Sequence, residues 1–95
     1  MRVQWTRPAH RDLEAIGDYL ARDAPAAAAR LVSRILSQVD RLATFPGIGR
    51  VGRVPDTREL VIVGTPFIVP YRVRDDVVEV LAVYHGARRW PEGFG

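Results

Sequence analysis

The chain has 95 residues, of which 47% are hydrophobic and 26% are charged, and it contains no cysteine. This composition is typical of one folded domain and excludes an intrinsically disordered chain, disulfide bonds and thiolate zinc sites. The formal net charge is +3, and all 14 basic residues are arginines spread along the sequence. The charge therefore permits a nucleic-acid-binding face without requiring one.

The sequence shows neither a membrane-spanning segment nor a signal peptide. No apolar run approaches the roughly 20 residues that a helix needs to cross a bilayer. The N-terminal segment, Met1–Trp5, has no apolar stretch of the kind found in signal peptides. We therefore expect a cytoplasmic protein without a membrane partner.

The first half of the chain predicts a strand and a helix. Arg2–Trp5 has Val3 and Trp5 on one face at period two, which indicates a strand. Thr6 can cap a helix, with Pro8 in its first turn, and the helix is predicted to end near Arg22. Its apolar stripe, spaced by three and four, consists of Leu13, Ile16 and Leu20.

A second helix is predicted from about Pro25 to Thr44. Asp23 supplies a capping side chain, and the first-turn proline follows it. A wide apolar stripe predicts burial against a sheet, and its central members are Leu31, Ile35 and Val39. Since the link between the two helices is so short, they should form an antiparallel hairpin.

The second half of the chain changes to a period of two, after an irregular stretch at 47–55. The predicted strands are Arg58–Val63, Phe67–Arg74 and Val77–His85. Short turns join them, which favours an antiparallel meander. Pro70 has no N–H to donate, so it should mark a bulge or an unpaired strand side.

The third of these strands, Val77–His85, is apolar on both faces, which predicts a place in the middle of the sheet. Strict alternation puts Leu81 and Val83 on the face opposite Val78 and Val80.

The predicted fold class is α+β. A helical hairpin should pack on one face of a small, mainly antiparallel twisted sheet, in the order β-α-α-β-β-β. The whole chain, 1–95, forms one domain, with an irregular C-terminal tail at 86–95.

The segment Gly47–Gly52 spells G-x-G-x-x-G, the pattern of dinucleotide-binding loops. That function requires a strand before the motif and a helix after it. Here a predicted helix precedes it and a loop with Pro55 follows. We therefore interpret the motif as a flexible connection between a helix and a strand.

Metal and cofactor sites are not expected. His10, Asp12 and Glu14 are spaced by two on a predicted helix, so they should fan out instead of converging on one ion. No other group of ligand-type side chains is evident.

His85 and the arginines after it form a candidate catalytic set. Histidine acts as an acid or base near neutral pH, and arginine holds phosphate groups. His85, Arg88 and Arg89 could therefore serve RNA cleavage by an attacking 2′-hydroxyl. The alternative, which we favour, is a strand-end histidine hydrogen-bonded to backbone, with arginines on the surface.

Two further side chains keep alternatives open. Trp90 either anchors the tail, which we favour, or offers a platform for base stacking. Arg58 could pair with Asp56 or Glu79, or it could contact a partner.

The order and spacing of several stretches are distinctive over nearly the whole chain. They are Asp12-Leu13, Leu42–Pro46 with Gly49-Arg50, Thr57–Leu60, Phe67–Val73 and Val78–Trp90. In these stretches the chain resembles the RelE/ParE superfamily of type II toxin–antitoxin toxins, and it is closest to the ParE-like branch.

The resemblance implies one of two activities. RelE-like members cleave mRNA in the ribosome, whereas ParE-like members poison DNA gyrase. The RNases place a basic residue in the middle strand, where this chain has Ile68, and some have a tyrosine where it has Gly86. An apolar residue cannot stabilise a phosphorane. We therefore expect a gyrase inhibitor that blocks DNA replication and is not an enzyme.

Two alternatives remain open beside the gyrase inhibitor. One is a metal-independent, ribosome-dependent endoribonuclease, and the other is a non-toxic interaction module. The residues expected to contact the target of a gyrase inhibitor are Arg58, Arg88, Arg89 and Trp90. Those that an endoribonuclease would use are His85, Arg88 and Arg72.

The resemblance also implies partners. A cognate antitoxin should neutralise the chain in a hetero-oligomer, and DNA should be contacted only through that complex, as in systems that stabilise plasmids. A disordered antitoxin segment would fold onto apolar anchors along the helical hairpin. The anchors expected are Leu13, Ile16 and Leu20.

Overall fold

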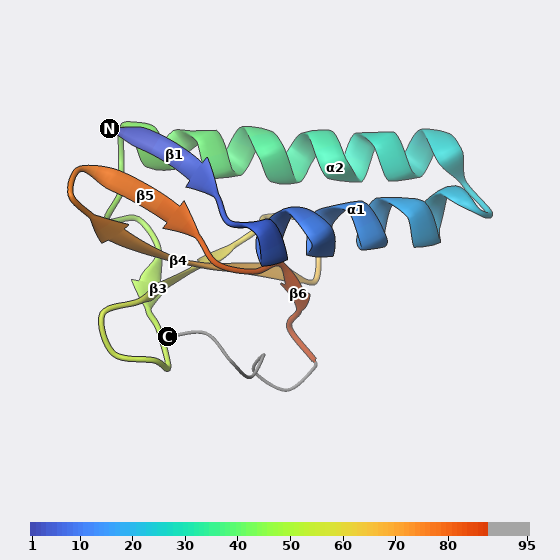
Figure 1. The fold of residues 1–95 in the computed structure, drawn as a ribbon. Helices are drawn as coiled ribbons and strands as arrows, with labels where there is room; N and C mark the ends of the chain where they lie inside the picture. Colours follow the sequence, from blue (N-terminus) through green and yellow to red (C-terminus); the bar gives the residue numbers. More distant parts are fainter. Residues whose placement is uncertain (88–95) are drawn as a thin grey trace.

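The computed structural model describes residues 1–87, in which two helices lie on the same side of a mixed sheet (Figure 1). The elements in chain order are β1 (Arg2–Trp5), α1 (Arg7–Ala21), α2 (Pro25–Asp40), the 3₁₀ helix η1 (Arg41–Ala43), β2 (Arg50–Val51), β3 (Arg58–Val61), β4 (Phe67–Arg74), β5 (Val77–Val80) and β6 (Tyr84–His85). The α+β hairpin-on-sheet architecture is confirmed.

The strands are ordered β1-β5-β4-β3-β2, and β6 pairs with β4 beyond the end of β5. β1 and β5 are parallel, whereas the other pairs are antiparallel. The prediction that the last long strand lies inside the sheet is confirmed, since β5 has β1 on one side and β4 on the other.

The predicted start of α1 is confirmed, and that of α2 needs a correction. The Thr6 hydroxyl accepts a hydrogen bond from the N–H of Ala9 and donates one to the Val80 carbonyl oxygen at 2.7 Å. The N-cap of α2 is Ala24, not Asp23, and no side chain caps it. Asp23 instead belongs to the turn that closes α1, where its N–H donates to the Leu20 carbonyl oxygen.

Three further boundaries differ from the sequence prediction, and the first is the end of β3, at Val61 instead of Val63. α2 ends at Asp40, because the chain tightens there into η1 instead of continuing as an α-helix to Thr44. The stretch 47–55 is not wholly irregular, since β2 lies within it and pairs Arg50 with Glu59 of β3.

The predicted strand Val77–His85 is broken by a bulge opposite Pro70. Val80 pairs with Tyr71, but Tyr84 pairs with Ile68, so three residues on one side face two on β4. The N–H of Leu81 still donates to the Pro70 carbonyl oxygen at 2.9 Å, while Pro70 has no N–H to return. The bulge that the proline predicted is therefore present.

The bulge also corrects the predicted facing of Val83. One extra residue reverses the alternation of every side chain that follows it. Val83 consequently joins Val78 and Val80 in the hydrophobic core beneath the helices, instead of pointing to the opposite face.

The core lies between the hairpin and the sheet. Ile35 and Val39 of α2 are completely buried in it, as predicted, together with Val69 and Tyr71 of β4. Leu31 is only partly buried, because it lies at the border of the core next to a surface groove. In residues 1–87, no helix is both long and apolar enough to cross a membrane.

Candidate functional site

An apolar groove of about 820 Å³ separates α1 from the edge of the sheet where β6 pairs with β4. α1 forms one wall, and β6 lies beneath its first turns (Figure 1). The turn before β4 and the β6 segment form the other wall. The apolar and aromatic residues that line it are Ala15, Ile16, Tyr19, Leu20, Leu31, Pro66, Phe67, Val83 and Tyr84.

The structure divides the three predicted antitoxin anchors between core and groove. Ile16 and Leu20 line the groove and are partly exposed. Leu13 is 7% exposed and belongs to the hydrophobic core. Of these three residues, Leu13 therefore contributes to the core, and only Ile16 and Leu20 are accessible to a partner.

Asp12 brings a carboxylate into the apolar groove. Its Oδ2 atom accepts a hydrogen bond from the N–H of Val83 at 3.0 Å, which joins α1 to the bulged segment before β6. Burial raises the pKa of this carboxyl, and the hydrogen bond from Val83 opposes that rise. Asp12 was not among the predicted site residues, although its spacing of four from Ile16 and eight from Leu20 puts all three on one helix face.

His85 ends β6 at the rim of this groove. Its Nδ1 atom accepts a hydrogen bond from the N–H of Ala87 at 3.1 Å, and its ring meets Phe67 edge to face at 5.7 Å between centroids. The next N–H, of Gly86, donates to the Pro66 carbonyl oxygen. His85 is thus hydrogen-bonded to backbone, which is the arrangement that the favoured sequence interpretation describes.

Arg72 lies away from His85. His85 pairs with Phe67, and Arg72 is five residues farther along β4, so its side chain is on the opposite face of the sheet. There its Nε atom donates to Glu79 Oε1 at 2.9 Å. Five residues of strand correspond to roughly 16 Å. The structure therefore does not bring these two candidate RNase residues together.

Arg58 forms a hydrogen bond within the chain. Its Nη1 atom donates to the Gly49 carbonyl oxygen at 2.8 Å, so it pairs with neither Asp56 nor Glu79. Glu79 accepts instead from Arg72, with Arg74 at 3.9 Å. The other residues proposed for the target contact or for RNA cleavage (Arg88, Arg89 and Trp90) lie outside the described part of the chain.

The glycine-rich motif is a packed connection, not a flexible one. The N–H of Gly49 donates to the Tyr71 hydroxyl at 2.9 Å, and a Cβ atom at Gly49 would lie 2.6 Å from that oxygen. A side chain at Gly52 would collide with Thr57. Close packing against β3 and β4 therefore explains Gly49 and Gly52 without a bound phosphate, whereas a Cβ atom at Gly47 would meet nothing.

The carboxylate of Glu59 is almost fully buried beside this connection. Arg50 Nη2 contacts its Oε1 atom at 2.9 Å, and the N–H of Arg53 donates to Oε2 at 3.2 Å. Because a buried charge needs partners, this cluster ties the loop after β2 to the sheet.

The metal-type side chains on α1 point in two directions. His10 and Glu14 do share a face, contrary to the predicted fanning out, since they are four residues apart and lie 3.3 Å from each other. Asp12 is directed to the groove instead. In residues 1–87, no three His, Asp or Glu side chains come close enough to hold a metal ion.

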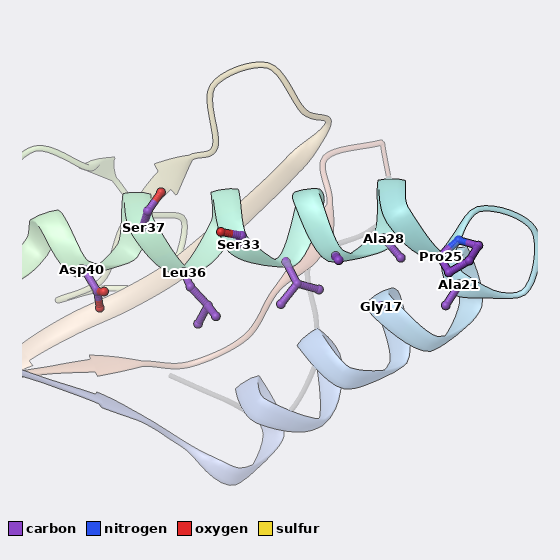
Figure 2. Close-up of a pocket in the computed structure, with 10 residues that line it drawn as sticks. Gly17, Ala21, Pro25, Ala28, Ser33, Leu36, Ser37 and Asp40 are labelled. Atoms are coloured by element: carbon purple, nitrogen blue, oxygen red, sulfur yellow. The ribbon is translucent and has the colours of Figure 1, made fainter.

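A second, shallower depression of about 660 Å³ lies on the hairpin itself (Figure 2). Small side chains line much of it, among them Ala21 and Ala28. A Cβ atom on Gly17 would lie 3.1 Å from Val32, so the depression reflects the close approach of α1 to α2. Its polar side chains are Ser33, Ser37 and Asp40 of α2.

Known proteins match this chain over almost its full length. The family model described as the ParE toxin of type II toxin–antitoxin systems matches residues 3–90. A putative toxin of Sinorhizobium fredii is 50% identical and covers 96% of this chain and 94% of its own length. Toxin RelE2 of Caulobacter vibrioides is 40% identical, over 90% of this chain and 96% of the relative.

Solved structures agree with the fold. A chain of the chromosomal ParDE toxin–antitoxin system from P. aeruginosa is 34% identical, with a TM-score of 0.82 over 90% of this chain and 95% of that one. A chain of the intact E. coli RelBE complex, at 15% identity and a TM-score of 0.65 over 92% and 98% of the two chains, shares the fold. With its hairpin, mixed sheet and full-length match, the chain belongs to the ParE toxin family of type II toxin–antitoxin systems.

Proposed function

We propose that this toxin inhibits DNA gyrase, without cleaving RNA, and that a cognate antitoxin neutralises it by covering the groove along α1. The observation that carries the choice of target is the placement of Arg72 and His85 on opposite faces of the sheet. General acid–base cleavage needs the acid or base and the phosphate-binding cation around one scissile bond.

The antitoxin is supported by the groove and by the relatives. Ile16, Leu20 and Phe67 present apolar surface in a depression large enough for side chains of a second protein. The solved relatives with this fold include chains from ParDE and RelBE toxin–antitoxin systems. By analogy, the antitoxin of this chain is encoded by the neighbouring gene.

The target is tested with the full chain released from its antitoxin. The purified toxin is added to a supercoiling assay with DNA gyrase and, in parallel, to translating ribosomes whose mRNA is analysed for cleavage. Two altered chains are compared with it: His85→Ala, and a chain that ends at Ala87 and so lacks Arg88, Arg89 and Trp90.

For a gyrase inhibitor, we expect His85→Ala to inhibit supercoiling nearly as well as the unaltered chain. The chain ending at Ala87 should lose inhibition and still bind the antitoxin, because Arg and Trp are enriched among residues that dominate binding energy. Ribosomal mRNA cleavage that falls by roughly 10²–10⁴-fold in His85→Ala, the usual contribution of an acid–base group, would instead establish the RNase.

A further inference from the structure

Among residues 1–87, Asp12 is the one carboxylate that lines the groove, and no arginine of that range lines it. This is unusual in a chain whose formal charge is +3 and whose arginines are spread along its length. The other titratable side chains in the lining are Tyr19 of α1 and Tyr84 and His85 of β6, while α2 contributes only Leu31.

The carboxylate has acceptor capacity to spare. One oxygen, Oδ2, accepts from the N–H of Val83 at 3.0 Å, and an ionised carboxylate offers about four acceptor positions. Within residues 1–87, Asp12 forms no ion pair. The other carboxylates withdrawn from solvent, Glu59 and Glu79, are both paired with arginines.

A half-buried carboxylate without a cation is unfavourable for the free toxin. Asp12 lines the groove and is partly withdrawn from water, which raises the pKa of its carboxyl, and one backbone hydrogen bond only partly opposes this cost. A cation brought into the groove would restore the missing interaction, whereas a wholly apolar occupant would desolvate the carboxylate further.

We propose that the antitoxin fills this groove with an amphipathic segment that carries one lysine or arginine for Asp12. Its apolar side chains lie against Ile16, Leu20 and Phe67, and its cation pairs with the free oxygen of Asp12. The ion pair fixes the register of the segment and excludes antitoxins with an apolar or acidic residue at that position. The inference rests on the proposed antitoxin partner.

The first experiment measures antitoxin affinity by calorimetry, using the protein encoded beside the toxin gene and the full toxin chain. Asp12→Asn keeps an oxygen that can accept from Val83 and removes the charge. Glu14→Gln is the matched control, because Glu14 is on the same helix, is 61% exposed and does not line the groove. Circular dichroism checks that both altered toxins are folded.

We expect Asp12→Asn to weaken antitoxin binding by about tenfold or more, in line with the loss of a partly buried charge pair, and Glu14→Gln to leave it unchanged. Each lysine and arginine of the antitoxin is then changed to alanine. One of these changes should weaken binding to the unaltered toxin and have little further effect on Asp12→Asn, because the two residues form one interaction.

Several results would overturn the inference. Equal affinity of Asp12→Asn and the unaltered toxin, with no coupled antitoxin cation, would reject the ion pair and leave the antitoxin role intact. Failure of the neighbouring protein to bind any form of the toxin would reject the proposed function and this inference together.

Two other occupants of the groove are distinguishable. If Asp12→Asn lowers the melting temperature of the free toxin, and removal of the residues after Ala87 abolishes that effect, the chain's own arginines are the partners of Asp12. If light scattering shows a free toxin dimer that Asp12→Asn dissociates, a second copy occupies the groove. Either result would refute a cation supplied by the antitoxin.

Discussion

The hydroxyl of Tyr71 in β4 donates a hydrogen bond to the carbonyl oxygen of Pro46, just beyond the helical hairpin, at 2.6 Å. The hydroxyl oxygen of Tyr71 also accepts a hydrogen bond from the N–H of Gly49 at 2.9 Å. Tyr71 is completely buried, so one side chain of the central sheet holds both sides of the turn that leads from the helices into β2.

Tyr71→Phe should therefore destabilise the fold. The change removes both hydrogen bonds and leaves a buried N–H and a carbonyl oxygen without this partner, at a cost of about 1–3 kcal/mol. Urea denaturation followed by circular dichroism measures the loss. Tyr19→Phe is the control, because Tyr19 is 70% exposed and should change stability by less than about 0.5 kcal/mol. Equal effects of the two changes would contradict the role of the Tyr71 hydroxyl.

Asp12 should make the stability of the free toxin depend on pH. Burial raises the pKa of its carboxyl above the ordinary value of 3.8, so the folded state binds the proton more tightly than the unfolded state. Its contribution to stability is therefore complete below that value and is lost as the pH rises through the folded-state pKa.

Asp12→Asn removes this titration. The free energy of unfolding of the altered toxin, relative to the unaltered one, should rise between about pH 3 and pH 7. Urea denaturation at several pH values checks the trend, with Glu14→Gln as the comparison for losing an acidic residue from α1. If the free energy of unfolding of Asp12→Asn relative to the unaltered toxin fell over this pH range, the pKa of Asp12 would be lowered by folding and the prediction would be wrong.

Gln38 of α2 protects the edge of the sheet beyond β3. Its Oε1 atom accepts from the N–H of Val63 at 2.9 Å, and its Nε2 atom donates to the Val63 carbonyl oxygen at 3.3 Å. The side-chain amide thus pairs with a backbone amide as a neighbouring strand would. Without it, the unpaired backbone groups of this strand edge could pair with a second molecule.

Gln38→Ala should cost about 1 kcal/mol and increase self-association as the protein is concentrated. Denaturation measures the first effect, and gel filtration over a range of concentrations measures the second. Ser33→Ala, on an exposed position of the same helix, should affect neither. If Gln38→Ala left the toxin as monomeric as Ser33→Ala does, Gln38 would not protect the sheet edge from association.

The turn between β4 and β5 offers a stabilising change. Asp75 and Asp76 have φ values of 52° and 60°, and two consecutive positive values are the signature of the type I′ turn, which favours glycine at its second position. Asp76→Gly should raise stability by about 0.5–1 kcal/mol, as measured by thermal denaturation. Asp76→Ala should lower it, because alanine has neither glycine's freedom nor the local hydrogen bonding of aspartate. The same sign for both changes would argue against strain at this turn.

The helices and the central strands follow from local patterns. The spacing of three and four in the stripe ending at Leu20, the Thr6 cap and the period-two segments each express a preference of neighbouring residues. The predicted hairpin, the α+β class and the central place of β5 were therefore accessible without a structure. Part of the candidate site was accessible too, because Ile16 and Leu20 belong to that stripe.

Only the tertiary structure decided how segments far apart in sequence meet. The Pro70 bulge was foreseeable, but its effect on Val83 was not, because a register shift depends on where each strand pairs. Asp12 received its role from Val83, which is 71 residues away. By sequence alone, Asp12 is one of several acidic residues of this helix, and its spacing from Ile16 and Leu20 does not show what its carboxylate contacts. Its surroundings are set by packing between α1 and β6, and no local preference encodes them.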